Sequence, residues 1–265
     1  MGSHLVKAAG TAGRVIHVTP KSAGWTYVGF DLHQLKQGER ISSRTGDREA
    51  CLVWIAGKGH AEAGGSDFGR LGKRMSPFDG APYALYVPAR SDWSVTAETD
   101  LEIAVCTAPG GGDHEARVIP PGAHAPLVRG KGSNLRHVTN IMPEDDEAAH
   151  SLLVVEVITP GGNTSSYPSH KHDEDNLPHE SKLEEIYYHR LNPRQGFAFQ
   201  RVYTGDRLLD EAMAVEDRDA VLVPKGYHPC ATIHGYDLYY LNVMAGPRRV
   251  WRFHTESEHK WLLGI

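Results

Sequence analysis

The chain has 265 residues, of which 40% are hydrophobic and 23% charged, an ordinary globular composition that argues against disorder or a fibrous repeat. Its 28 Lys and Arg against 33 Asp and Glu give a formal charge of -5, and no basic block occurs, so we expect no nucleic-acid partner. No apolar run is long enough to span a bilayer, no signal segment opens the chain, and three scattered cysteines form no CxxC pair. We therefore expect a cytoplasmic protein with no membrane partner.

Short strand-like segments follow one another along most of the chain. They are rich in β-branched or aromatic residues and are bounded by Gly, Pro, Asp or Ser. In chain order they are 14–18, 25–32, 50–56, 84–87, 101–106, 152–158, 185–190, 197–203, 220–223 and 238–244. One amphipathic stretch, Arg207 to Ala214, predicts a short helix. The pattern predicts an all-β protein, built as sandwiches or barrels with a few short helices.

The two halves of the chain echo each other. Val87 and Val223 each end a strand and precede a proline. Upstream, the apolar segment 50–57 stands where 185–192 stands in the second half. We therefore predict two tandem β modules, residues 5–120 and 121–265, with a Gly/Pro-rich join from about 108 to 132. One irregular barrel is the alternative.

The main chemical signal is a set of histidines and a carboxylate in the second half. His170 and His172 are two residues apart, so on a strand both imidazoles point to one face. After an acidic loop, a strand opens with Glu184 and Glu185, and His228 lies on the turn Val-Pro-Lys-Gly-Tyr-His-Pro. Three imidazoles and one carboxylate suit a divalent first-row metal and leave positions open for a substrate.

The first module lacks this set. Ala50 stands at the place of the glutamate, Asp92 stands at the place of the third histidine, and no HxH precedes Ala50. We therefore expect the first module to bind no metal and to serve packing or dimer contact.

The order HxH, then a glutamate that begins an aromatic strand, then PxGxHP, resembles the two metal-binding motifs of the cupin superfamily. The resemblance implies tandem cupin barrels, a bicupin. The metal ligands that it implies are His170, His172, Glu185 and His228. Glu185 is preferred to Glu184 because the family's glutamate directly precedes the hydrophobic strand residues; the long preceding loop and Asn192, in place of a usual glycine, depart from the family pattern. Zinc, manganese, iron, nickel and cobalt all accept this ligand set.

Longer strings resemble one bicupin family in particular, the 5-deoxy-D-glucuronate isomerases of myo-inositol catabolism. The likeness extends over nearly the whole chain, and the strings that carry it are 165–173, 183–190, 195–203, 223–229 and 236–246. Relatives of this family include the 5-keto-4-deoxyuronate isomerase. The resemblance implies a metal-dependent aldose–ketose isomerase that converts open-chain 5-deoxy-D-glucuronate to 5-dehydro-2-deoxy-D-gluconate through an enediolate. A Lewis-acid metal polarises the carbonyl, and a base moves the proton between the two carbons.

Several residues are candidates for that base. Strand alternation puts Tyr187 and His189 on the same face as Glu185, and Tyr240 lies on a later strand. We rank His189 first, since histidine titrates near neutral pH and tyrosine does not. Lys171 alternates against the HxH histidines and is the weakest candidate.

The carboxylate of a sugar-acid substrate requires a cation, ideally one that binds it in a bidentate manner. The odd positions of 197–203 share one face, so Arg201 and Tyr203 are expected to line the cavity together, and Arg248 is a further candidate. A surface arginine is the alternative interpretation of Arg201.

Two other functions use the same motifs. An iron oxygenase of the cupin type uses the same four ligands and consumes oxygen. A non-catalytic sugar-binding bicupin with a structural metal shows no turnover. We expect a homodimer, because cupin sandwiches expose sheet edges that favour pairing.

Overall fold

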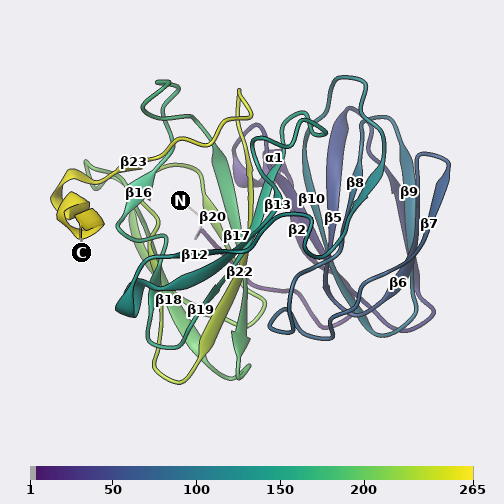
Figure 1. Ribbon diagram of the computed structural model, residues 1–265, viewed down its shortest axis with the longest axis horizontal. Coiled ribbons are helices and arrows are strands. Elements are labelled where there is room, and N and C mark those ends of the chain that lie inside the picture. The colour runs from purple at the N-terminus through teal and green to yellow at the C-terminus, as the bar shows by residue number, and fades with distance from the viewer. Residues whose placement is uncertain (1–3, 265) are drawn as a thin grey trace. The chain divides into compact units, whose positions relative to one another are not determined.

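The computed structural model describes residues 4–264, which form mostly strands and divide into two compact units (Figure 1). Among the described residues, the C-terminal unit comprises 4–7, Pro126–Asn140 and 155–264, and the N-terminal unit comprises Ala8–Ala125 and Ile141–Val154. Three short helices are present among the described residues: α1 (Pro20–Ala23), η1 (Gly132–Asn134) and η2 (Ser257–Gly264). Within the described part of the chain, no helix combines the length and apolar character that crossing a membrane requires.

The N-terminal unit is a sandwich of two antiparallel sheets. The larger sheet has the order β11-β8-β5-β10-β3-β2, and the smaller has the order β4-β9-β6-β7. The larger sheet is formed by β2 (Gly13–Val18), β3 (Gly29–Leu35), β5 (Arg48–Ala56), β8 (Ala84–Val87), β10 (Leu101–Pro109) and β11 (Arg117–Ile119). The smaller sheet is formed by β4 (Arg40–Arg44), β6 (Gly59–Ala63), β7 (Ser66–Leu71) and β9 (Asp92–Ala97).

Alternating side chains from both sheets fill the space between them. Leu52 and Trp54 of β5 point inward from the larger sheet, and Ala61 and Val95 point inward from the smaller one. All four are fully buried. Burial of such apolar surface contributes roughly 25 cal/mol per Å² to folding, so this core holds the two sheets together.

The C-terminal unit repeats this arrangement. Its large sheet has the order β1-β20-β17-β22-β14-β13-β12, beside a four-stranded sheet β15-β21-β18-β19 and a two-stranded sheet β16-β23. The large sheet is formed by β1 (Leu5–Val6), β12 (Leu127–Arg129), β13 (Arg136–Met142), β14 (Leu153–Thr159), β17 (Glu184–Asn192), β20 (Ala220–Val223) and β22 (Asp237–Ala245). The smaller sheets are formed by β15 (Thr164–Ser165), β16 (His170–Lys171), β18 (Phe197–Tyr203), β19 (Asp210–Glu216), β21 (Cys230–Thr232) and β23 (His254–Thr255).

The echo between the two halves of the sequence corresponds to equivalent strand positions. In the N-terminal unit β5 lies between β8 and β10, and in the C-terminal unit β17 lies between β20 and β22. Ala50 pairs with Val87 just as Glu185 pairs with Val223. The prediction of an all-β tandem fold is therefore confirmed, with the same strand order around the central strand of each unit.

A buried carboxylate ties the segment 141–154 to the N-terminal unit. Glu49 of β5 is fully buried, and it accepts hydrogen bonds from the backbone N–H groups of His150, Ser151 and Leu152 at 2.8, 2.7 and 2.7 Å. The Tyr86 hydroxyl donates a fourth at 2.7 Å. The Glu49 carboxylate is therefore the shared acceptor for four hydrogen-bond donors, and these bonds fix where the segment 141–154 packs.

Two sequence expectations about secondary structure are wrong. The helix predicted for 207–214 is absent: Asp210–Glu216 forms β19, and Met213 and Val215 are buried alternately with exposed neighbours. Pairing with β18 along the whole strand outweighs helix propensity there. The strand predicted from Trp25 begins only at Gly29, because the Trp25 indole folds back and donates to the Val28 carbonyl at 2.7 Å.

Candidate metal centre and its cavity

Three histidines of the C-terminal unit gather around one point. His170 lies on β16, His172 follows that strand, and His228 lies in the turn between β20 and β21. One ring nitrogen of each lies within 4.8 Å of those of the other two. This is close to the spacing of about 3–4 Å that ligands about 2.1 Å from a shared ion require.

Backbone carbonyls fix the proton position on each imidazole. In every ring Nδ1 faces a carbonyl oxygen, which can only accept a hydrogen bond, so Nδ1 donates and, in the neutral ring, Nε2 carries the lone pair. The distances are 3.4 Å from His170 to Pro168, 3.2 Å from His172 to Leu183 and 2.8 Å from His228 to Gly226. Metal-binding histidines are commonly oriented in this way.

Glu185 completes the cluster from the start of β17. Its Oε2 lies 3.0 Å from Nε2 of His172 and 3.1 Å from Nε2 of His228. At these distances a protonated ring donates from Nε2 to the carboxylate, and a divalent cation bound by both groups would replace that proton. The four predicted ligands therefore lie together, and their donor types and orientations fit a divalent metal.

Charge is shared between Glu185 and the histidines beside it. Burial acts to lower the pKa of His172, but the hydrogen bond to Glu185 raises it above its ordinary value, so a bound metal ion would displace a proton there. Burial alone would raise the pKa of Glu185, but the adjacent His228 and His172 lower it to about 2. Burial, with His228 and His172 nearby, lowers the pKa of His170 well below its ordinary value. A carboxylate and neutral imidazoles are the forms that bind metal ions.

Glu184, the alternative ligand, is disfavoured by its position. It precedes Glu185 on β17, and successive strand residues point to opposite faces of a sheet. Its counterpart in the N-terminal unit is Glu49, the residue just before Ala50. The Glu49 carboxylate points to the opposite face of its sheet from Ala50, and it accepts hydrogen bonds from backbone N–H groups there.

A cavity of about 40 Å³ lies beside the cluster, and His170 and Glu185 form part of its wall. Because a water requires roughly 10–15 Å³ of cavity volume, the cavity has room for about three waters. Its other lining residues come mainly from one face of the large sheet: β12, β13, β14, β17 and β22 all contribute.

A chain of hydroxyl groups runs along this cavity. The Tyr187 hydroxyl lies 2.8 Å from Oγ of Ser166, which lies 3.5 Å from the Tyr240 hydroxyl. The Tyr240 hydroxyl lies 2.6 Å from Oγ of Ser165. Ser166 has φ of 49°, a left-handed conformation that is unusual outside glycine and is often found at functional sites. Each hydroxyl can both donate and accept, so the chain can carry a proton.

His189 lies behind these tyrosines rather than in the cavity wall. Its ring stacks on Tyr187, with centroids 5.8 Å apart, and meets Tyr240 at 6.0 Å. Its Nε2 lies 2.9 Å from Oε1 of Gln200, while its buried Nδ1 has no hydrogen-bond partner among the described residues. Complete burial lowers the pKa of His189 to about 4, so the ring is neutral at pH 7.

The predicted substrate-binding residues are not brought to this cavity. Arg201 is exposed and binds Asp210 through two nitrogens, at 2.7 and 2.6 Å. The Tyr203 hydroxyl donates to Glu256. Arg248 lies 3.5 Å from Asp175. The odd positions of β18 do share one face, but it is largely the exposed one.

Among the cavity residues that escaped the sequence analysis are Arg129, Arg136, Ser166 and Asn242. Asn242 donates from its side chain to Oε1 of Glu185. The period-two alternation of β22 could have found it, because Asn242 shares a face with Tyr240. No local signal marks the two arginines, which lie in and next to the stretch interpreted as a join.

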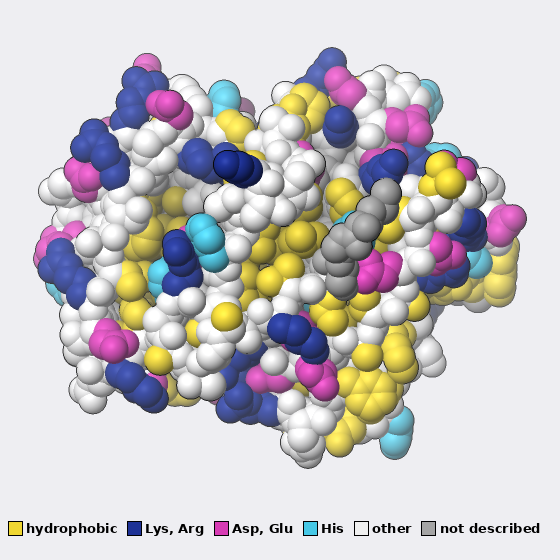
Figure 2. All heavy atoms as spheres, turned by 180° about the vertical axis from the view of Figure 1, so that it is seen from behind, with side chains coloured by type: hydrophobic (Ala, Val, Ile, Leu, Met, Phe, Trp, Pro, Cys, Tyr) yellow, Lys and Arg dark blue, Asp and Glu magenta, His cyan; other side chains and the backbone are white. Residues whose placement is uncertain are grey.

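A larger pocket of about 770 Å³ adjoins in the same unit, between the loop 130–134 and η2, and Arg136 lines both spaces. Elsewhere, charges are mixed: on the face drawn in Figure 2, Lys and Arg side chains are interspersed with Asp and Glu. That face therefore presents no continuous basic surface of the kind that binds nucleic acid.

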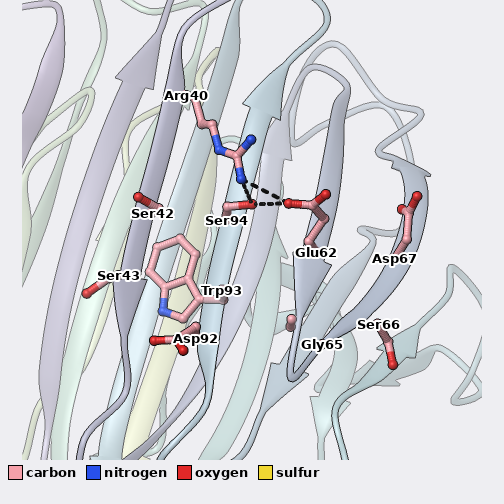
Figure 3. A pocket seen from close by; sticks show the side chains of 11 residues that line it. Arg40, Ser42, Ser43, Glu62, Gly65, Ser66, Asp67, Asp92, Trp93 and Ser94 are labelled. Carbon is pink, nitrogen blue, oxygen red and sulfur yellow. Dashed lines mark hydrogen bonds and ion pairs between the residues drawn. The ribbon is translucent and has the colours of Figure 1, made fainter.

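The N-terminal unit has a cavity of its own, of about 570 Å³, on its four-stranded sheet (Figure 3). The Arg40 guanidinium donates to Ser94 and to Glu62, both at 2.9 Å, and Ser94 donates to Glu62 at 2.9 Å. These groups satisfy one another, and no histidine lines the cavity among the described residues. Its chemistry thus differs from that of the histidine cluster.

The KduI/IolB family model matches residues 4–262. The chain belongs to the KduI/IolB family. A protein named 5-deoxy-glucuronate isomerase from Geobacillus kaustophilus (strain HTA426) is 53% identical over 252 residues, which cover 95% of this chain and 91% of that protein. A second protein of the same name, from Geobacillus thermodenitrificans (strain NG80-2), is 52% identical over 95% of this chain and 92% of its own length.

Solved structures agree with this assignment. An IolB-like protein from Salmonella typhimurium LT2 has a TM-score of 0.96 and 55% identity, with 98% of each chain covered. The oxalate decarboxylase of Lactobacillus farciminis, solved as a formate complex, has a TM-score of 0.67 at 14% identity, over 100% of this chain and 91% of that one. The second likeness supports the fold alone, and it agrees with the cupin fold expected from the sequence.

Proposed function

We propose that this protein is a 5-deoxy-D-glucuronate isomerase, and that it converts this aldose to 5-dehydro-2-deoxy-D-gluconate with one divalent metal ion. Relatives with that name share about half of its residues over nearly the whole chain. The structural observation that carries the proposal is the convergence of ring nitrogens of His170, His172 and His228 within 4.8 Å of one another, with the Glu185 carboxylate 3.0 and 3.1 Å from two of these rings.

The reaction moves hydrogen within one molecule. The C2 hydrogen leaves as a proton, a proton is added at C1, and the hydroxyl proton moves from O2 to O1, so no external oxidant or reductant is consumed. A bound divalent ion, held by His170, His172, Glu185 and His228, would act as a Lewis acid that polarises the substrate carbonyl and acidifies the adjacent C–H.

The chain's own residues supply the proton path. The Tyr187 and Tyr240 hydroxyls line the cavity and are joined through Ser166, so a proton taken at one carbon can be returned at its neighbour. His189 packs against both rings from behind, one step removed from the cavity, and its Nδ1, unpartnered among the described residues, keeps it our candidate for the group that finally accepts the proton.

An NMR assay of purified protein with 5-deoxy-D-glucuronate, paired with elemental analysis, tests the proposal. The expected result is conversion to the ketose, with about one metal ion per chain. His170→Ala and His228→Ala should lower metal content and turnover together, whereas His60→Ala, on the N-terminal unit, should change neither. Full activity after the metal is stripped with a chelator would contradict the metal-dependent mechanism.

The rival functions give different results in the same samples. An iron oxygenase consumes dissolved oxygen when substrate is added, and the isomerase does not. A sugar-binding protein with a structural metal unfolds when metal is removed but never forms ketose.

We further propose that the protein is a homodimer that acts in the cytoplasm in myo-inositol catabolism, with a metal-free module over residues 5–120 and a metal-binding module over 121–265. Exposed Phe197 and Phe199, on the outer side of β18, offer an apolar surface for pairing. Light scattering of the purified protein measures the oligomeric state directly.

A further inference from the structure

Two arginines stand directly opposite each other in the C-terminal unit, on neighbouring antiparallel strands. Arg129 of β12 and Arg136 of β13 are register partners, so their side chains share one face of the sheet. Like charges in that position destabilise a sheet. Burial and the nearby Arg129 both act to lower the pKa of Arg136. The pair therefore favours an anion that binds both guanidinium groups.

The protein itself provides no such anion among the described residues. Arg136 donates from Nη1 to the Asn134 carbonyl at 3.0 Å, and Arg129 lies 5.9 Å from the ring centre of Trp251. Neither arginine has a carboxylate within ion-pair distance in the described part of the chain. Other arginines of the protein do: Arg190 binds Asp217 at 2.8 Å, and Arg201 binds Asp210.

Both arginines line the cavity that also contains His170 and Glu185. Three strand spacings of about 4.8 Å separate β17, which carries Glu185, from β13. An extended six-carbon acid together with an arginine side chain covers that distance. The 40 Å³ cavity is too small for the whole substrate, but Arg136 also lines a 770 Å³ pocket of the same unit. A carboxylate can therefore meet Arg136 from either space, whereas Arg129 lines the smaller one alone.

We propose that Arg136, assisted by Arg129, binds the carboxylate of the sugar acid while its aldehyde end lies at the histidine cluster. This assignment rests on the proposed isomerase function and replaces Arg201 and Arg248 in that role, since each of these already faces a carboxylate of the chain. Guanidinium groups are suited to it because they present several donors in one plane to the two carboxylate oxygens.

The experiment compares Arg136→Met, Arg136→Lys and Arg129→Met with the wild type in steady-state kinetics, with metal content measured for each. We expect Arg136→Met to raise KM for 5-deoxy-D-glucuronate about 10- to 100-fold, the loss of a charge-assisted hydrogen bond, with metal content unchanged. Arg136→Lys should recover part of the loss. Arg14→Met, in the N-terminal unit, is the matched control.

A substrate without the carboxylate makes the test specific. In 5-deoxy-D-glucose C6 is a hydroxymethyl group. The wild type should have a KM for this sugar about 10- to 100-fold higher than for the acid, and Arg136→Met should raise that KM no further. If Arg201→Met raises KM for the acid and Arg136→Met does not, the assignment is overturned. It is also overturned if the wild type treats the acid and the neutral sugar alike.

Binding separates this proposal from the proposed function. If the wild type shows no turnover, the isomerase assignment fails, and thermal-shift titration with D-glucuronate and D-glucose still tests the arginines. Stabilisation by the acid alone, lost in Arg136→Met, supports the carboxylate site, and equal effects of both sugars overturn it. Without ligand, Arg136→Met should not lower Tm, because it removes like-charge repulsion; a variant that unfolds would show that Arg136 is structural.

Discussion

Asn242 holds one oxygen of the Glu185 carboxylate and thereby leaves the other for the histidines. Its side-chain nitrogen donates to Oε1, and Oε2 faces His172 and His228. Both residues are buried, at 4% and 2% exposure, so bulk water does not compete with the amide for this oxygen. The orientation of the acidic ligand therefore depends on a residue of the neighbouring strand β22.

Replacing this amide should weaken metal binding without removing a ligand. We expect Asn242→Leu to lower metal affinity about 10- to 100-fold, the usual effect of losing such a supporting hydrogen bond. Competition with a fluorescent chelator measures the dissociation constant. Glu156→Gln, a buried change at the Tyr239 hydroxyl in the same unit, is the control. Equal affinities for Asn242→Leu and the wild type would show that Glu185 needs no such support.

His189→Gln should separate proton transfer from metal binding. Gln can still reach Gln200, so the fold and the metal content should be kept, while hydrogen exchange at the substrate carbons in deuterated water should slow by about 100-fold or more if His189 is the base. Gln200→Leu, which removes the hydrogen-bond partner, should slow exchange less. An unchanged exchange rate in His189→Gln would show that another group is the base, and the Tyr187 and Tyr240 hydroxyls would then be the next candidates.

Burial of the neutral His189 ring should make the protein less stable in acid. The unfolded ring takes up a proton near pH 6.5, but the folded ring does so only near pH 4. Between these values the unfolded state binds more protons, so this contribution is complete above pH 6.5 and declines as pH falls to 4. It amounts to about 3 kcal/mol. Urea unfolding of metal-stripped wild type and His189→Gln should show this difference shrinking from pH 7 to pH 4.

The buried carboxylate of Glu49 should be a major source of stability. In Glu49→Gln an amide nitrogen would face backbone donors, so we expect the free energy of unfolding to fall by about 3 kcal/mol or more. Tyr86→Phe removes one of the four hydrogen bonds and should cost about 1–2 kcal/mol. Chemical denaturation monitored by tryptophan fluorescence checks the order; a larger loss in Tyr86→Phe would contradict it.

The strand pattern and the metal motif could be predicted because both depend on residues that are close together in the sequence. Central strands such as β5 and β17 are continuous apolar or aromatic runs, and the HxH spacing places two imidazoles together whatever lies around them. The equivalence of Ala50 and Glu185 also followed from local strings. Short edge strands such as β12 and β16 have no such pattern, and tertiary pairing decides them.

Alternation along β18 shows why Arg201, one of the predicted cations, does not line the cavity. Period two correctly groups Phe197, Phe199 and Arg201, but it does not say which face is inside. The aromatic residues suggested the odd face, whereas the smaller Ala198 and Gln200 are the buried ones. Arg136, the cavity cation, is brought there by a long-range pairing of strands that no local string encodes.

The pairing of β1 with β20 has a consequence for biosynthesis. Lys7 binds Asp219 at 2.8 Å across 212 residues of sequence, next to the strand pair of Leu5 and Val221. At about 5–20 residues per second, a ribosome needs roughly ten to forty seconds after it has synthesised β1 to synthesise β20, the strand that pairs with it. Until then β1 has no partner strand, and the C-terminal unit closes its large sheet only when synthesis of the chain is nearly complete.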